Sequence, residues 1–175
     1  MRVNKMIKIF TVHKQGQTIP HKVLEGIACQ SVECCLVPIS REQGQTPRLN
    51  NVNNWISALE FGTDEVFVGM DSDVVMDDPE TIAVLFEAMK AGVFMTAIRT
   101  QIIQHRAKLA HALFACSEPD VLREELLGIR RKWTGHCAMC TSMRNLIQKG
   151  KRIKIIGFPM AYECVRETLQ RKGNR

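Results

Sequence analysis

Apolar and polar positions alternate in blocks along the first hundred residues, and each block has the length of a strand or a helix. Residues 6–12 and 34–39 are short apolar runs rich in β-formers, and both predict strands. Residues 19–30, between them, carry Pro20 near a first turn and an apolar face at helical spacing, which predicts a helix. This order predicts βαβ units: an α/β fold with a mostly parallel central sheet and helices on both faces.

The same alternation continues through the next fifty residues. Residues 51–61 place apolar side chains at the i, i+3, i+4, i+7 spacing of a helix that lies on a core, with Trp55 in that stripe. The polar residues 40–50 before it predict a loop, and residues 65–70 after it predict a short buried strand. Asp78-Pro79-Glu80 then has the composition of a helix start.

The second half of the chain predicts fewer strands. Residues 93–98 and 152–158 predict strands, whereas residues 102–131 predict mostly helix, with a second helix start at residues 117–120. Two further helices are predicted over residues 141–150 and 163–172. No linker rich in Pro, Gly or Ser interrupts the 175 residues, so we expect one domain over residues 1–175.

Composition adds expectations about compartment and partners. No apolar run approaches the roughly 20 residues that cross a bilayer, and the seven cysteines follow no disulfide framework. We therefore expect reduced thiols and a cytoplasmic protein. The net charge of +6 suits an anionic partner such as nucleotide phosphates, nucleic acid or lipid headgroups, although a solvated basic face gives the same composition.

The sequence Asp71-Ser72-Asp73 carries the chemistry that the chain suggests most clearly. In extended backbone, residues two apart point to the same side, so both carboxylates are expected to face one way at the end of a buried strand. Paired carboxylates suit Mg²⁺ or Mn²⁺, which also coordinate substrate phosphates. The alternative is an acidic turn that caps the following helix.

The order of these segments resembles a family 2-type glycosyltransferase with the GT-A fold. The matching segments are Ile9–Val12, the helix that ends at Gln30, the helix that contains Asn53–Ala58, and the apolar strand that leads into Asp71-Ser72-Asp73. The resemblance continues more loosely through Gly135, Arg144 and the segment Glu163–Gly173. In that segment, Cys164 stands where the family has the second residue of an acidic pair.

This resemblance implies a transferase that moves a sugar from a nucleotide-diphosphate sugar to an acceptor, with Mn²⁺ or Mg²⁺ as cofactor. It implies a nucleotide-binding half over about residues 1–100 and an acceptor-side half over about residues 101–175. Asp73 would hold the cation directly, and Asp71 would bind it through water or hold the ribose. Glu163 would be the general base. The residues implied to line the nucleotide site are Thr11, His13, Arg48 and Asn53.

Two other function classes stay open on the sequence. A nucleotidyltransferase on a related sheet would bind a triphosphate through the loop after the first strand, which has one glycine, Gly16. A non-catalytic protein would use its basic surface to bind nucleic acid or a membrane, but no specific nucleic-acid signature accompanies the charge. A peripheral membrane contact or a homo-oligomer contact through that basic surface is the remaining partner expectation.

Overall fold

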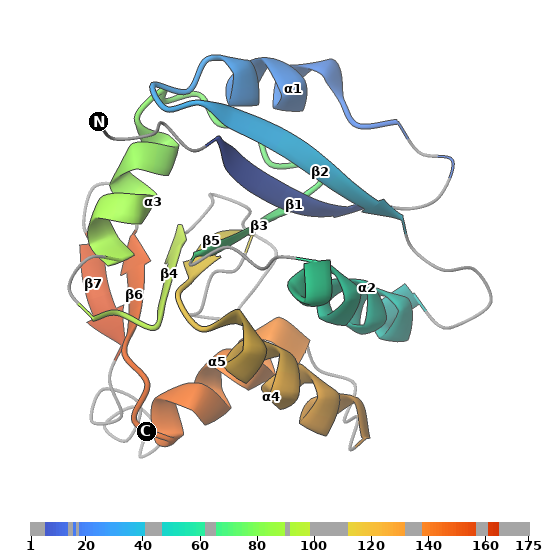
Figure 1. Cartoon of the computed structure of the whole chain (residues 1–175), viewed down its shortest axis with the longest axis vertical. Coiled ribbons are helices and arrows are strands. Elements are labelled where there is room, and N and C mark those ends of the chain that lie inside the picture. The colour runs from blue at the N-terminus through green and yellow to red at the C-terminus, as the bar shows by residue number, and fades with distance from the viewer. Residues whose placement is uncertain are drawn as a thin grey trace, which may run out of the picture.

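The computed structural model describes residues 6–13, 16, 18–40, 47–61, 66–89, 92–98, 112–131, 138–156 and 161–164. For residues 47–51 and 161–164 it describes the backbone only. These residues form three layers, in which one sheet lies between two groups of helices (Figure 1).

The sheet has seven strands in the order β2-β1-β3-β5-β4-β6-β7. β1 is parallel to both β2 and β3, and β4 is parallel to β6, whereas β5 and β7 are antiparallel to their neighbours. Five of the seven strands therefore point the same way, which confirms the predicted mostly parallel sheet. The strand bounds are β1 Ile7–His13, β2 Cys34–Ser40, β3 Phe67–Asp71, β4 Met95–Ile98, β5 Leu113–Cys116, β6 Ile153–Ile156 and β7 Ala161–Cys164.

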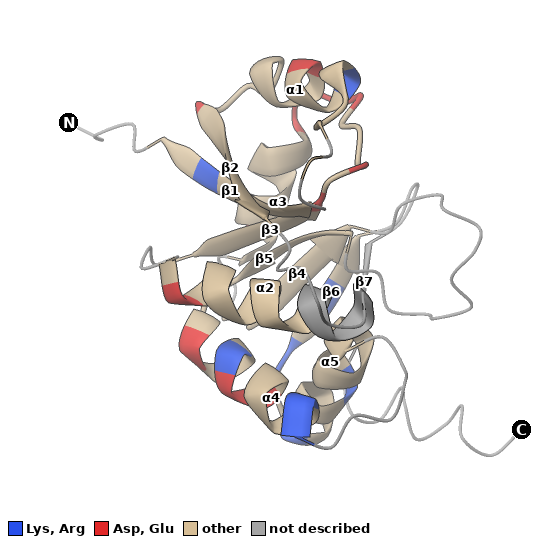
Figure 2. Cartoon of the chain, turned by 90° about the vertical axis from the view of Figure 1, so that its right-hand side faces the viewer, with Lys and Arg blue, Asp and Glu red and all other residues tan. Residues whose placement is uncertain are grey.

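Helices cover both faces of this sheet, as predicted (Figure 2). α1 (His21–Ala28) and α3 (Thr81–Met89) pack on one face, where their apolar side chains join Ile9, Val68 and Met70. α2 (Pro47–Phe61), α4 (Pro119–Arg131) and α5 (Ala138–Gln148) pack on the opposite face. We call these the α1 face and the α2 face of the sheet.

Aromatic rings fill the core under α2. Phe10 stacks on Phe67 with ring centroids 5.0 Å apart, and Trp55 meets the edge of Phe114 at 5.5 Å. Trp55 is buried, which confirms its expected place on the apolar stripe. Gly69 makes room for these rings, because a Cβ at that position would lie 2.4 Å from Cζ of Phe114.

The structure corrects three predictions of local structure. Residues 113–116 form β5 in the middle of the sheet rather than helix, because this short apolar run is buried on both sides. α2 begins at Pro47, inside the predicted loop, since proline is well tolerated in a first helical turn. Residues 163–164 belong to β7 rather than to a helix, and the rest of that predicted helix lies outside the described residues, as do residues 102–111.

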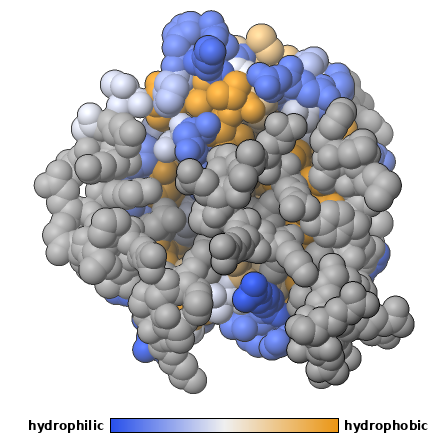
Figure 3. Space-filling view, turned by 180° about the vertical axis from the view of Figure 1, so that it is seen from behind, coloured by the Kyte–Doolittle hydropathy of each residue, from blue (hydrophilic) through white to orange (hydrophobic). Residues whose placement is uncertain are grey.

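Charged and apolar side chains are distributed unevenly over the surface. Charged residues of both signs gather on α4 (Figure 2), which has Asp120 in its first turn and Arg130 and Arg131 in its last. Seen from behind, apolar surface lies among hydrophilic residues at the end of the molecule where α1 lies (Figure 3). Within the described ranges, no helix combines the length and the hydropathy that a membrane span requires.

Candidate functional site at the carboxyl edge of the sheet

The parallel strands β1, β2 and β3 end side by side, and this edge collects the residues that the sequence singles out. In register, Val12 lies opposite Asp71 of β3, and His13 lies opposite Ser40 of β2. We call the ends of these three strands the carboxyl edge. Ligands bind at such edges in open α/β sheets because the connecting loops emerge there.

Thr11 and His13 bring to this edge polar atoms that have no partner among the described residues. The Thr11 side chain is fully buried, and no group in the described part of the chain hydrogen-bonds its Oγ1. Its neighbours in register are Pro38 and Met70, which offer no good partner. Nδ1 of the half-buried His13 also lacks a partner among the described residues. A buried polar group without a partner costs about 1–3 kcal/mol, so such atoms are candidates for contact with a ligand.

Asp71 and Asp73 lie on different kinds of backbone. Asp71 is the last residue of β3 and is half-buried, whereas Asp73 is exposed in a turn that the Val74 N–H closes by donating to the Asp71 carbonyl at 3.2 Å. The prediction that residues 71–73 continue as extended backbone is therefore wrong, because the strand ends at Asp71. The turn nevertheless leaves both residues at the carboxyl edge, two positions apart.

The strand register also places the nucleotide-site candidates on opposite faces of the sheet. Thr11 pairs with Met70 of the α1-face core, whereas Asp71 pairs with Val12 of the α2-face core. Because side chains alternate along a strand, Thr11 and His13 belong to the α1 face and Asp71 to the α2 face. A ligand that contacts all three must cross the end of β1.

Helix α2 supplies two asparagines on the α2 face. Asn53 is half-buried and Asn54 is 3% exposed, and Nδ2 of Asn54 has no hydrogen-bond partner within the described ranges. Asn54 belongs to no motif that its sequence reveals. The available signal was its position next to the apolar stripe, where a buried amide is unusual. Arg48 lies in the first turn of α2, and only its backbone is described.

Glu163 is the candidate that the fold places elsewhere. It lies in the edge strand β7 in register with Lys154, near the start of β6 rather than near its carboxyl end. Three strands separate β7 from β3, and at ordinary strand spacing this corresponds to roughly 19 Å. The role of Glu163 as a base therefore stays a prediction that its position in the sheet does not support.

The donor chemistry at the carboxyl edge fits a hard divalent cation. Asp71 and Asp73 provide carboxylate oxygens, which Mg²⁺ and Mn²⁺ prefer. Across the described ranges, no three His, Cys, Asp or Glu side chains gather into a metal site. Two carboxylates suit a cation that keeps waters and shares its coordination with phosphates, and they do not suit a closed structural site.

Comparisons by sequence and by structure give different results. No protein-family model and no curated protein matches the chain. A glycosyltransferase involved in glycosylation of the major capsid of PBCV-1 matches with a TM-score of 0.62 at 13% identity, over 86% of this chain and 82% of its own. The mannosyltransferase PcManGT from Pyrobaculum calidifontis, solved with GDP-Man and Mn²⁺, matches with a TM-score of 0.56 at 12% identity, over 84% of this chain.

A third match belongs to another reaction class. CMP:2-keto-3-deoxy-manno-octonic acid synthetase, complexed with CTP, matches with a TM-score of 0.52 at 8% identity, over 95% of this chain and 96% of its own. At such identities the likeness defines the fold alone: the chain has the GT-A fold of nucleotide-sugar transferases. It spans 53% of the length of the mannosyltransferase.

Proposed function

We propose that the chain is a metal-dependent glycosyltransferase that moves a sugar from a nucleotide-diphosphate sugar to an acceptor. The observation that carries this proposal is the strand register at the carboxyl edge. Asp71 lies beside the end of β1, and β1 carries the buried Thr11 hydroxyl and the His13 imidazole. The GT-A fold supports the proposal, because PcManGT, which shares this fold, was solved with GDP-Man and Mn²⁺.

Each residue of the edge has a role that matches its chemistry. Thr11 and His13 bind the nucleoside on the α1 face, where their side-chain atoms that lack a partner among the described residues accept or donate hydrogen bonds. Asp73 holds Mn²⁺ or Mg²⁺ directly, and Asp71 binds it through water or holds the ribose. A bound cation neutralises charge on the leaving diphosphate.

Helix α2 contributes to the same site. The Asn53 and Asn54 amides would contact the donor from the α2 side, and Arg48, in the first turn of the helix, would supply a positive charge for the diphosphate. In the transfer, the bond from the anomeric carbon to the diphosphate oxygen breaks and a bond to the acceptor oxygen forms. The acceptor proton passes to a base, for which Glu163 remains the sequence-derived candidate.

A thermal-shift panel tests this function. We expect one of UDP-glucose, GDP-mannose or a CDP-sugar to raise the melting temperature by a few degrees only when Mn²⁺ or Mg²⁺ is present. The variant Asp73→Ala should lose that response, and the matched variant Asp77→Ala, which removes another exposed carboxylate, should keep it. The proposal fails if no nucleotide sugar stabilises the wild-type protein with either metal.

A nucleotidyltransferase is the second candidate, and the match to the CTP-bound synthetase over 95% of this chain favours it. Such an enzyme would bind a nucleoside triphosphate at the same carboxyl edge and release pyrophosphate. Stabilisation by CTP or another triphosphate, with no response to any nucleotide sugar, would select this candidate. Salt-sensitive binding to mixed DNA with no nucleotide response would instead favour a non-catalytic basic binder.

A further inference from the structure

The connection from β3 to α3, residues 72–80, lies against α1 rather than in open solvent. Val74 and Met76 of this connection are buried in the α1-face core. The backbone of α1 approaches them closely at Gly26, where a Cβ would stand 2.8 Å from the carbonyl oxygen of Met76. The segment that carries Asp73 is therefore packed directly against the helix that follows β1.

One side chain, that of Gln30, joins this connection to α1 and α3. Its Nε2 donates to the Gly26 carbonyl at 2.9 Å and to the Asp78 carbonyl at 3.1 Å. Its Oε1 accepts from the Ile82 N–H of α3 at 3.0 Å. The Gln30 amide thus bonds one carbonyl near the end of α1, one carbonyl near the end of the connection and one backbone N–H in the first turn of α3. Helix geometry leaves the N–H groups of a first turn without a partner inside the helix.

Further bonds hold the connection at both of its ends. The Asp71 N–H donates to the Ala112 carbonyl at 2.7 Å, and the Ser31 N–H donates to the Pro79 carbonyl at 2.8 Å. Asp73 lies between these anchors, exposed on its turn, so the backbone of the connection sets where its carboxylate stands. A metal ligand on a short turn depends on such supporting contacts for its position.

We propose that Gln30 is a positioning residue for the cation site, which it serves by holding the β3–α3 connection that presents Asp73. This inference rests on the proposed function, because it assumes that Asp73 binds a divalent cation. Gln30 touches neither the cation nor the nucleotide. It reduces the freedom of the turn before the cation arrives, and a preorganised turn binds more tightly.

The test measures Mn²⁺ affinity rather than turnover. Wild type, Gln30→Ala and Gln30→Glu are titrated with Mn²⁺ in the presence of UDP, GDP or CDP, and bound Mn²⁺ is followed by electron paramagnetic resonance. We expect the dissociation constant to rise about threefold to tenfold in Gln30→Ala. Gln30→Glu keeps the acceptor for the Ile82 N–H but places a carboxylate against two carbonyl groups, so we expect at least the same loss.

Two matched variants separate positioning from general loss of stability. Ser117→Ala removes hydroxyl bonds to the Val93 and Phe94 carbonyls at the far edge of the sheet, and Gln148→Ala truncates an exposed glutamine at the end of α5. Both should bind Mn²⁺ as wild type does. Unchanged affinity in the two Gln30 variants, or an equal loss in Ser117→Ala, would overturn the inference alone. Absence of Mn²⁺ binding by wild type would overturn the proposed function as well.

Discussion

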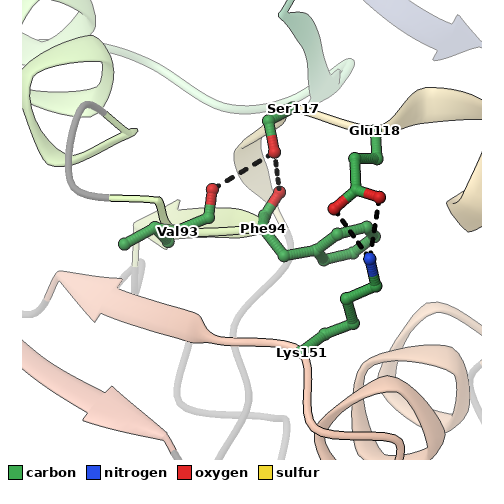
Figure 4. A network of polar contacts seen from close by, with 5 residues as sticks. All are labelled: Val93, Phe94, Ser117, Glu118 and Lys151. Atoms are coloured by element: carbon green, nitrogen blue, oxygen red, sulfur yellow. Dashed lines mark hydrogen bonds and ion pairs between the residues drawn. The ribbon is translucent and has the colours of Figure 1, made fainter.

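The two edges of the sheet differ in how the polar groups at the ends of their strands are paired, although each edge also has a nearby buried threonine, Thr11 or Thr96, whose hydroxyl has no partner in the described part of the chain. At the amino edge, where β4 and β6 begin and β5 ends, the Ser117 hydroxyl lies 3.2 Å from the Val93 and Phe94 carbonyls, and Lys151 pairs with both carboxylate oxygens of Glu118 (Figure 4). At the carboxyl edge, Thr11 Oγ1 and His13 Nδ1 have no partner in the described part of the chain.

This difference indicates that the amino edge serves the stability of the fold and that the carboxyl edge serves ligand binding. At the amino edge, Ser117, Glu118 and Lys151 are paired, so they stabilise the fold and leave little for a ligand to bind. Groups at the carboxyl edge cost stability when they are left unpaired, and a ligand can recover that cost. We therefore expect substitutions at the amino edge to change the free energy of unfolding, and substitutions at the carboxyl edge to change ligand response.

The sharpest test of the comparison is Asp71→Asn. This change preserves the size of the side chain but removes its charge, so we expect the dissociation constant for Mn²⁺ with a nucleoside diphosphate to rise about tenfold to a hundredfold. The measurement is the same Mn²⁺ titration, and urea unfolding should show the variant folded. A full metal response in Asp71→Asn would show that the Asp71 carboxylate does not help to hold the cation.

The largest expected change in stability lies between the two edges, at Gly69 of β3. In Gly69→Ala the new Cβ would stand 2.4 Å from Phe114 and 2.9 Å from Trp55, so we expect a loss of about 1–3 kcal/mol in the free energy of unfolding. The matched variant Gly128→Ala meets nothing within 4 Å on α4, and alanine should stabilise that helix by up to about 1 kcal/mol. Urea denaturation measures both, and equal effects would contradict this account.

The sequence predicted the fold best where hydrophobic periodicity and length agreed. β1, α1, β2 and β3 lie where the pattern placed them, because each is either a long amphipathic stretch or an apolar run bounded by polar residues. β5 was missed because Leu113–Cys116 is a short apolar run without alternation. Such a run fits a buried helix equally well, and only its pairing with both β3 and β4 decides.

The candidate site was predictable in its location and not in its geometry. Strand order alone put Thr11, His13 and Asp71 at one edge, and the register agrees. The turn at residues 72–73 was not foreseeable from alternation, because it is closed by the bond from the Val74 N–H to the Asp71 carbonyl, just beyond the last pair of the β3–β5 ladder. The position of Glu163 depended on a strand pairing between β6 and β7 that no local pattern encodes.

A pH series tests how the burial of Cys116, next to the amino edge, affects the stability of the fold. Burial raises the pKa of the Cys116 thiol to about 12 from its ordinary 9.0. The folded protein therefore keeps this proton when the unfolded chain has lost it, so stability is complete below pH 9 and falls as the pH rises toward 12. We expect Cys116 to lower the free energy of unfolding by about 1 kcal/mol between pH 9 and pH 10.

Urea unfolding at pH 8, 9 and 10 measures this fall. Cys116→Ala should reduce the dependence, whereas the matched variant Cys29→Ala, which removes an exposed thiol, should leave it as in wild type. An unchanged slope in Cys116→Ala would mean that the thiol does not control alkaline stability. Burial and the nearby Cys35 also raise the pKa of Cys34, to about 11, so some dependence should remain in Cys116→Ala.

The smallest expected effect belongs to the ion pair of the amino edge. Lys151 Nζ lies 2.7 Å and 2.8 Å from the Glu118 carboxylate oxygens and 5.2 Å from the centre of the Phe94 ring. Because both side chains are partly exposed to solvent, Lys151→Met should lower the free energy of unfolding by only about 0.5–1 kcal/mol.

Salt and a second substitution identify the source of that small loss. The difference between wild type and Lys151→Met should shrink in 0.5 M NaCl, because salt screens the ion pair and leaves the packing of the lysine stem, which methionine retains. In a double-mutant cycle with Glu118→Gln, we expect a coupling of a few tenths of a kcal/mol.

Neither variant should alter the Mn²⁺ titration, since the pair lies at the edge opposite Asp71. A changed Mn²⁺ affinity in Lys151→Met would contradict the difference between the two edges, because it would show that the ion pair at the amino edge influences the ligand site at the carboxyl edge.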